Sequence, residues 1–522
     1  MTLPYAGCSG LFLLTCLILA NSVAAGSALG PAIPDCPGCG MVWTDTCEPF
    51  ESGDEAAYNE QLEAAFSPVA ANITQVADLR NESWSDAFLA VHSLLKERYA
   101  FTSWKEVDWD ALYDRYAPAV ADAEQRNDNA SYYRALREYI YSVPDGHINI
   151  LSENGDFGAR YADIGGGFGI TVNLLDSGVY IVSYVAEGSE AEKAGVRSGD
   201  RVTQWNGTEI HEAVNGTPYI WATKKPSTRE GIRLHQQRFL TRGPVGSEVD
   251  ISLVSEDTRS ATVHLTAYDD GYDTVNRSSF FLGKMINDYG TEKTWLDIKP
   301  QISTDPVTVR TLAGGYTYIA VYEESFTIYQ PFREAVRSAI ANNSPGIVLD
   351  LRFNGGGDDN LASCMAGWFA REPVFYEFAT TYDPGLQNHS IISAACTKPR
   401  PAIYEGPVVL LVSPDTISSG EGVPMIMNRT GRGTIVSWYG TNGAFGMVAE
   451  AAIMPLDMEI LYPNGASLDE DRSIQVDSDT SRMGGVAPHL RVPMTEETIA
   501  RAMAGEDVQL TYALDELKKQ PR

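Results

Sequence analysis

An unbroken apolar run followed by a polar turn is the strongest constraint that this sequence places on its fold. The five apolar residues Val408–Val412 are typical of a strand buried on both faces of a sheet. Pro414 and Asp415 break the run, and the segment ISSGEG (417–422) then begins a helix. A hydroxyl at such a strand-to-helix turn lies beside free N–H groups, which suits a nucleophile with an oxyanion site. Serine is also a preferred helix N-cap, so this segment alone leaves Ser418 open to either role.

The composition indicates a multidomain protein with an acidic surface. Its 522 residues suffice for roughly two to four domains, and 44% hydrophobic residues allow a large core. With 69 acidic and 39 basic residues the formal net charge is −30. Such a charge disfavours nucleic acid and anionic membranes as partners.

The first 25 residues have the features of a secretion signal. Leu11–Ala20 is apolar but short for a bilayer span, and Ser22–Ala25 offers small residues for cleavage. No lysine or arginine precedes the apolar run, so an uncleaved membrane anchor is the alternative. We therefore expect residues 1–25 to be a signal peptide, residues 26–83 to be a tether or extension, and the mature protein to be secreted or extracytoplasmic.

Cysteine usage agrees with export. Three cysteines near the mature N-terminus favour disulfides or free thiols over zinc because no fourth ligand is in view, and two later cysteines could pair with each other. These five are Cys36, Cys39, Cys47, Cys364 and Cys396. We expect no metal and no cofactor. Potential glycosylation sites are Asn72, Asn81, Asn129, Asn206, Asn215, Asn276, Asn342, Asn388 and Asn428.

Residues 84–150 are expected to form a small helical bundle. Apolar residues recur at helical spacing from Trp84 onward, and further helices are predicted after Asp108 and over 130–143. The bundle ends in the turn PDGH (144–147), which presents His147 at the start of a strand. A histidine in such a place is often structural, so the turn alone does not assign a role.

Residues 160–268 resemble a PDZ domain. A glycine-rich segment precedes a strand, and a second strand, a short helix and the turn before a third strand follow in the PDZ order. The residues in the position of the PDZ loop that binds a peptide's C-terminal carboxylate are Gly167, Phe168, Gly169 and Ile170. The resemblance implies peptide binding, whereas a glycine loop that only turns the chain is the alternative. An insertion from about residue 214 to residue 242 could alter or cover the groove.

The sequence predicts an α/β domain over 305–517, joined to the PDZ-like region by a connector over 269–304. A buried strand ends in DLRFNGGG (350–357), and sites collect at the carboxyl ends of such strands. The Lys-Ser/Thr pair of a phosphate-binding loop is missing. We expect Asp350 and Arg352 to form a structural ion pair or to hold the loop.

DLRFNGGG followed by TISSGEG (416–422) resembles the carboxyl-terminal processing peptidases and the tricorn core protease. The PDGH turn and the segment GGVAPHLRVP (484–493) extend this resemblance over roughly residues 84–517. The resemblance implies an α/β fold with a catalytic domain of the ClpP/crotonase type, an N-terminal helical bundle and an inserted PDZ domain. It also implies serine peptidase activity.

The resemblance assigns the nucleophile and the oxyanion donors. The family's nucleophilic serine lies three positions before the glutamate of a Ser-x-x-Glu segment, which here is Glu421. This register makes Ser418 the nucleophile, with backbone N–H groups of Ser419 and Gly356 forming the oxyanion hole.

The resemblance also selects the general base. One branch of the family uses a lysine about 25 residues after the serine, but the chain has no lysine between Lys398 and Lys518, and Gly443 occupies that register. The other branch, related to tricorn and the retinoid-binding repeats, uses a histidine from the end of the helical domain. His147 matches it, and imidazole suits proton transfer near neutral pH.

Some positions depart from the tricorn pattern. Gly146 rather than serine precedes His147, and His489 stands where an aspartate is usual. The acids that could orient the imidazole are Glu470, Asp471, Asp477 and Asp479. We expect a secreted serine endopeptidase-like protein whose PDZ domain presents polypeptide substrates through their C-terminal tails. The alternative is an inactive relative that binds peptides or apolar ligands.

Overall fold

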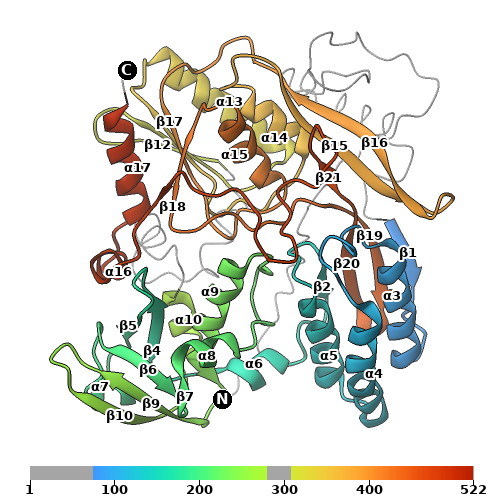
Figure 1. Cartoon of the computed structure of the whole chain (residues 1–522), viewed down its shortest axis with the longest axis vertical. Coiled ribbons are helices and arrows are strands. Elements are labelled where there is room, and N and C mark those ends of the chain that lie inside the picture. Colours follow the sequence, from blue (N-terminus) through green and yellow to red (C-terminus); the bar gives the residue numbers. More distant parts are fainter. Residues whose placement is uncertain (1–73, 279–306, 521–522) are drawn as a thin grey trace, which may run out of the picture.

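The computed structural model describes residues 74–278 and 307–520. In Figure 1 the N-terminal helices lie at the lower right, a β-rich domain at the lower left, and a larger α/β domain above both. The expected signal peptide, the three N-terminal cysteines, Asn72 and most of the expected tether and connector lie outside the described residues. In the part of the chain that is described, no helix has the length and apolarity needed to cross a membrane.

Three capped helices build the N-terminal module. Ser83, Asp108 and Asp128 each accept an N–H of the first helical turn, which fixes where the three helices begin. The elements are β1 (Thr74–Asp78), α3 (Trp84–Arg98), α4 (Trp109–Arg126), α5 (Asn129–Ser142) and β2 (Asn149–Ser152).

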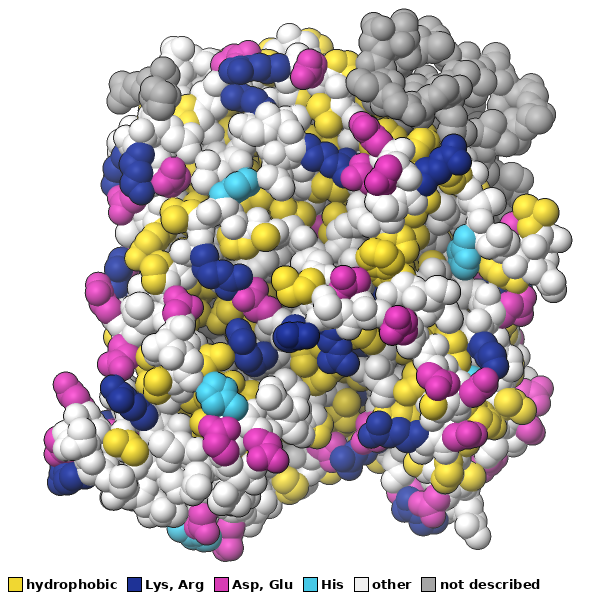
Figure 2. Space-filling model, in the orientation of Figure 1, with side chains coloured by type: hydrophobic (Ala, Val, Ile, Leu, Met, Phe, Trp, Pro, Cys, Tyr) yellow, Lys and Arg dark blue, Asp and Glu magenta, His cyan; other side chains and the backbone are white. Residues whose placement is uncertain are grey.

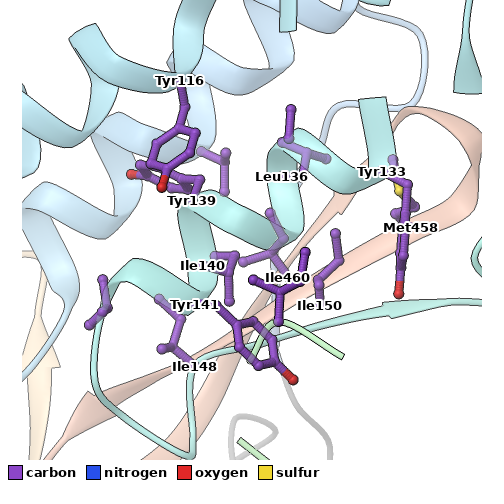
Figure 3. Close-up of a cluster of buried hydrophobic side chains, with 14 of the residues drawn as sticks. Tyr116, Tyr133, Leu136, Tyr139, Ile140, Tyr141, Ile148, Ile150, Met458 and Ile460 are labelled. Atoms are coloured by element: carbon purple, nitrogen blue, oxygen red, sulfur yellow. The ribbon is translucent and has the colours of Figure 1, made fainter. Parts of the chain in front are cut away.

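The helical module shares a sheet and a core with the C-terminal half of the chain. Strands β1 and β2 flank the hairpin of β19 (Met447–Met454) and β20 (Met458–Gly465) in the order β1-β19-β20-β2. Figure 3 shows Leu136 and Ile140 of α5 gathered with Ile150 of β2 and Ile460 of β20. The strand that directly follows His147 is therefore anchored to the domain that carries Ser418.

The second module is a small β-domain with the expected order of elements. Its main sheet runs β10-β9-β6-β5-β4, which leaves β4 at one edge. The strands are β3 (Gly166–Gly167), β4 (Ile170–Leu174), β5 (Tyr180–Val185), β6 (Arg201–Trp205), β7 (Thr208–Glu209), β8 (Arg242–Gly243), β9 (Glu248–Val254), β10 (Ser260–Thr266) and β11 (Tyr268–Asp269). The helices are α6 (Ala159–Ile164), α7 (Glu190–Lys193), α8 (Ile210–Asn215), α9 (Arg229–Leu240) and α10 (Asp273–Arg277).

The third module is a three-layer α/β domain. Its sheet runs β12-β13-β14-β17-β18-β22, with β12 antiparallel and the rest parallel. The strands are β12 (Val307–Thr311), β13 (Thr317–Val321), β14 (Ile347–Asp350), β15 (Val374–Asp383), β16 (Asn388–Thr397), β17 (Val408–Leu411), β18 (Thr434–Ser437), β21 (Ser467–Leu468) and β22 (Leu490–Arg491). The helices are α13 (Phe326–Ala341), α14 (Asp359–Ala366), α15 (Ser419–Arg429), α16 (Glu496–Met503) and α17 (Val508–Lys519), with the short 3-10 helix η1 (Pro455–Asp457).

Strand β17 is buried on both faces, as its apolar run predicts. Val408 and Leu410 pack into the core beneath α13, α14 and α15, whereas Val409 and Leu411 pack beneath α16 and α17. Because β14 is its parallel neighbour, with Asp350 opposite Leu411, the glycine run and the serine turn emerge at the same sheet edge. The expected mixed α/β fold is confirmed, while the crotonase-type assignment stays a prediction.

Two local expectations about this domain are also met. Arg352 is fully buried between Asp350, at 2.6 Å, and Asp507, at 2.7 Å, so it holds the loop that follows β14. Cys364 of α14 and Cys396 of β16 are disulfide-bonded.

Candidate active site

Ser418 occupies a strained turn between β17 and α15. Its φ of 60° and ψ of −141° lie in a region that residues other than glycine avoid, and strain of this kind concentrates at functional sites. Its side chain makes no capping hydrogen bond, so the N-cap interpretation is not supported. The strained backbone is held because the N–H of Ser418 donates to the carbonyl of Ala444 (2.9 Å) and its carbonyl accepts from Glu421 (2.7 Å).

The glycine run lies directly against Ser418. A Cβ placed on Gly356 would lie 2.4 Å from Ser418 Cβ and 3.0 Å from its Oγ, and the φ of Gly356 is +84°. Only glycine therefore fits at this position.

The N–H groups of the run are not equivalent. Gly355 donates to the Tyr322 carbonyl (2.9 Å), and Gly356, the donor implied by the resemblance, donates to Asn354 Oδ1 (2.8 Å). By contrast, the N–H groups of Gly357 and Ser419 donate to no described residue. Both groups belong to the serine turn and its neighbour, because Ser419 follows Ser418 and its Oγ donates to the carbonyl of Gly357 (2.8 Å).

The turn that carries His147 packs on the loop before Ser418. A Cβ on Gly146 would lie 2.8 Å from Ile417 Cδ1 and 2.5 Å from Asn442 Oδ1. This contact explains why glycine, and not the serine of the tricorn pattern, precedes His147. The structure thus places the residue before His147 against the residue before Ser418, although the two come from different modules.

The imidazole of His147 is buried, with 4% of its surface exposed, and neither ring nitrogen has a hydrogen-bond partner among the described residues. No hydrogen bond joins it to Ser418. Burial lowers the pKa of His147 to about 4, because the opposing effect of nearby Asp145 is smaller and Lys105 adds to the lowering. The ring is therefore neutral at pH 7, which is the form that can accept a proton.

The acid beside His147 is Asp145, which the sequence analysis did not propose. Its Oδ1 accepts the backbone N–H of His147 (2.8 Å), and its Oδ2 accepts the Tyr99 hydroxyl (2.6 Å). Burial favours the neutral form of Asp145, but the positive charge of Lys105 and these hydrogen bonds outweigh burial and lower the pKa of Asp145, so it is ionised. The sequence feature that could have identified Asp145 is its position two residues before His147 in the PDGH turn.

The four acids that the sequence did propose differ in their surroundings. Glu470 and Asp471 are exposed, and Asp479 accepts from Ser481 within its own loop. Asp477 is buried, and its Oδ2 accepts the N–H of Phe445 (3.1 Å). Burial raises the pKa of Asp477 well above its ordinary value, so Asp477 favours its neutral form.

A clamp formed by Lys225, Ser227 and Asn442 connects the two halves of the site. Ser227 Oγ accepts the N–H of Gly146 (2.7 Å) and donates to Asn442 Oδ1 (2.8 Å). Asn442 Nδ2 donates to the carbonyls of Lys225 (3.2 Å) and Pro414 (2.9 Å). The insertion expected at about residues 214–242 of the PDZ domain thus crosses to the serine loop.

Glu421 supports the serine from the opposite side. Its carboxyl oxygens accept the N–H groups of Gly443 (2.9 Å) and Ala444 (3.0 Å) and the hydroxyl of Thr441. The same Ala444 accepts the N–H of Ser418. Burial raises the pKa of Glu421 to about 8.

Part of the expected PDZ loop is paired with the chain itself. Gly167 lies in β3, between β8 and β11, and Arg242 and Asp270 fill the space beside it. Phe168 donates its N–H to Thr241, and Ile170 begins the edge strand β4. Helix α10 also contacts β4. Carboxylate binding by Gly167, Phe168, Gly169 and Ile170 stays a prediction.

The described residues include no cluster of three or more His, Cys, Asp or Glu side chains placed to hold a metal. A hydroxyl, a neutral imidazole and two free N–H groups are the parts required for acyl transfer.

Three family models match the chain. Peptidase family S41 matches residues 315–492, the Tricorn protease C1 domain matches residues 80–131, and a PDZ domain matches residues 166–233. The first region contains the serine turn, the second contains helices α3 and α4, and the third contains strands β3 to β7 of the small β-domain. No curated protein sequence matches the chain significantly.

Solved structures that match the chain have low sequence identity. Mature CPAF is 12% identical, with 84% of this chain and 98% of that chain covered and a TM-score of 0.56. Mature CPAF complexed with lactacystin is 11% identical, with coverages of 84% and 99% and a TM-score of 0.53. The photosystem II D1 C-terminal processing protease is 17% identical, with coverages of 82% and 99% and a TM-score of 0.34.

Proposed function

Because the chain belongs to the family of carboxyl-terminal processing and tricorn-like serine proteases, we propose that it hydrolyses peptide bonds with Ser418 as nucleophile and His147 as general base. The observation that carries the proposal is the strained Ser418, which caps nothing and lies between the glycine run and the histidine turn.

In the proposed reaction, Ser418 Oγ attacks the scissile carbonyl carbon while the neutral imidazole of His147 takes the hydroxyl proton. The carbonyl oxygen becomes an oxyanion that accepts the N–H groups of Ser419 and Gly357. His147 then gives its proton to the leaving amine, and water hydrolyses the acyl-enzyme by the same steps. Losing one oxyanion donor typically costs about 2.7–4 kcal/mol of transition-state stabilisation.

Asp145 is the residue that stabilises the charged imidazole in this scheme. An ionised carboxylate beside His147 favours the imidazolium that forms in the transition state. Burial lowers the pKa of His147 overall, but the negative charge of Asp145 acts in the opposite direction and raises it. The absence of a hydrogen bond between Ser418 and His147 is compatible with catalysis, because such bonds often tighten only when substrate binds.

The test is labelling of the purified mature protein with a serine-directed phosphonate, together with hydrolysis of unstructured polypeptides. We expect labelling and hydrolysis in wild type and in Ser419→Ala, whose backbone N–H is retained, and neither in Ser418→Ala. Labelling that persists in Ser418→Ala would contradict the assignment of Ser418 as the nucleophile. Hydrolysis at the wild-type rate by His147→Gln would show that another group is the base.

A binding protein without turnover is the second candidate function. The buried, unpartnered imidazole is the observation that favours it, because an inactive site does not need a hydrogen-bonded pair. Peptide binding by wild type with neither phosphonate labelling nor hydrolysis would establish this alternative.

We also propose that the protein is exported and that its PDZ domain contributes to polypeptide binding. The disulfide between Cys364 and Cys396 supports an oxidising compartment. Sequencing the N-terminus of the secreted protein tests the export proposal: a mature chain that begins near residue 26 supports it, and an intact N-terminus retained inside the cell contradicts it.

A further inference from the structure

A cationic pocket lies between the PDZ domain and the peptidase domain. Its volume is about 880 Å³, and it is lined by the end of β4, the first turns of α9, the residues after β18 and the loop around residue 481. Figure 2 shows lysine and arginine side chains gathered across the middle of this face, between the lower-left domain and the upper one.

Positive charge dominates the pocket lining. Four arginines contribute to it, namely Arg229, Arg233, Arg482 and Arg491. Asp176 is the one acidic side chain that lines the pocket, and its Oδ2 already accepts the N–H of Met494 (2.8 Å). This concentration of arginine is unusual for a chain with a net charge of −30.

Donor groups of three residues that line the pocket have no acceptor among the described residues. The guanidinium groups of Arg233 and Arg482 make no hydrogen bond or ion pair with any described residue, whereas Arg491 is paired with Glu230 at 2.7 Å. Trp438 is 6% exposed, and its indole N–H has no hydrogen-bond partner within the described ranges. Guanidinium and indole groups only donate hydrogen bonds, so a ligand that fits this pocket would supply acceptor oxygens.

The pocket adjoins the candidate active site but is distinct from the PDZ loop. Arg229 lines the pocket and directly follows Thr228. Thr228 packs against Gly443, because a Cβ placed on Gly443 would lie 2.9 Å from Thr228 Cγ2. Gly443 and its neighbour Ala444 bind Glu421, and Ala444 also binds the nucleophile's N–H. The PDZ loop precedes β4, whereas the pocket lies at the other end of that strand.

We propose that this pocket binds carboxylates of a polypeptide substrate, either acidic side chains or a free C-terminus, while another part of the same polypeptide reaches Ser418. Arginine forks bind carboxylates with two parallel hydrogen bonds, and the Trp438 N–H adds a further donor. A pocket of this size between two domains of a peptidase accommodates a peptide segment rather than a single small anion. This inference rests on the proposed function, since it deepens the selection of substrates.

The test measures fluorescence anisotropy of labelled peptides bound to the full-length Ser418→Ala protein, so that no turnover is needed. Three peptides of equal length are compared: an acidic peptide with an amidated C-terminus, a neutral peptide with a free C-terminus, and a neutral amidated peptide. We expect at least one carboxylate-bearing peptide to bind about tenfold or more tightly than the neutral amidated one, and to weaken as salt rises.

Variants locate the binding. Arg233→Gln should weaken the preferred peptide about tenfold or more, and Trp438→Phe should weaken it several-fold while leaving the neutral amidated peptide unchanged. Arg482→Gln should weaken the preferred peptide in the same way, and because Arg482 is exposed, this substitution does not disturb packing. Arg259→Gln is the matched control, because Arg259 is exposed on the β9–β10 hairpin and does not line the pocket.

Equal binding of the three peptides, or full binding by both Arg233→Gln and Arg482→Gln, would overturn the inference. Displacement by millimolar inorganic phosphate together with equal binding of the peptides would show a small-anion site instead. Carboxylate preference without hydrolysis by wild type would refute the peptidase proposal alone. Hydrolysis without carboxylate preference would refute only the pocket inference.

Discussion

Acidification offers a direct test of His147 as the base, because its surroundings make an unusual pH profile. A typical histidine base has a pKa of 6.5 and loses activity just below neutral pH. In this protein burial lowers the pKa of His147 to about 4. The acidic limb of kcat/KM, which reports the free enzyme, should therefore lie near pH 4.

The difference is large at pH 5.5. A base with a pKa of about 4 is roughly 97% unprotonated at that pH, whereas a base with a pKa of about 6.5 is roughly 9% unprotonated. Activity at pH 5.5 should thus stay close to its value at pH 7.5, and the alternative predicts a loss of about tenfold. Asp145→Asn removes the carboxylate that raises the pKa of His147, so it should move the limb to still lower pH and slow the reaction.

The assay is hydrolysis of an internally quenched peptide between pH 3.5 and 8, with an uncharged cleavage segment so that the substrate does not titrate. The unfolding temperature at each pH is the control. The expected change of stability with pH follows from linkage. Below about pH 6.5 the unfolded histidine binds a proton and the folded one does not, so this residue destabilises the fold as the pH falls toward 4. Activity that halves near pH 6.5 in fully folded protein would refute the buried, neutral base.

Three further perturbations follow from the same geometry. Gly356→Ala should lower kcat by about 100-fold or more, because its Cβ would overlap Ser418. Gly355→Ala is the control and should retain activity, because the nearest atom to its Cβ would lie 3.7 Å away. An equal loss of activity in both variants would contradict this prediction. Ser227→Ala leaves the buried N–H of Gly146 without an acceptor, so it should lower the free energy of unfolding by about 1–3 kcal/mol and also lower kcat. Thermal unfolding and turnover measure these effects. Unchanged values would show that the clamp has no part in the mechanism. Reduction should lower the unfolding temperature, since the chain-entropy effect of the loop from Cys364 to Cys396 is about 4 kcal/mol, and a double Ala variant of this pair should not respond to reductant.

The sequence predicts well those features that depend on local pattern. The buried run at 408–412 identifies a central strand, because only a strand covered on both faces tolerates consecutive apolar residues. The serine turn and the glycine run meet because their strands are parallel neighbours. The turn that carries His147 reaches the serine loop, and the strand after this turn pairs with β20.

Features that depend on tertiary hydrogen bonds could not be predicted in this way. Which glycine of the run keeps a free N–H depends on Asn354, which takes the N–H of Gly356. Which acid lies beside the imidazole depends on how Asp145 folds back within its turn. The arginine pocket is invisible to motif analysis, because its residues come from segments separated by more than two hundred positions.

The proposed mechanism requires that two modules stay docked, and the structure contains two separate means of holding them together. The first is apolar: β2 pairs with β20, and Ile148 and Ile150 are buried in the shared core, each contributing about 1.5–3 kcal/mol by its burial. The second is polar and lies at the site itself, where Ser227 and Asn442 join the histidine turn to the serine loop. Because a buried polar link is directional and the apolar core is not, we expect the core to hold the modules together and the clamp to set the position of the histidine turn relative to the serine loop.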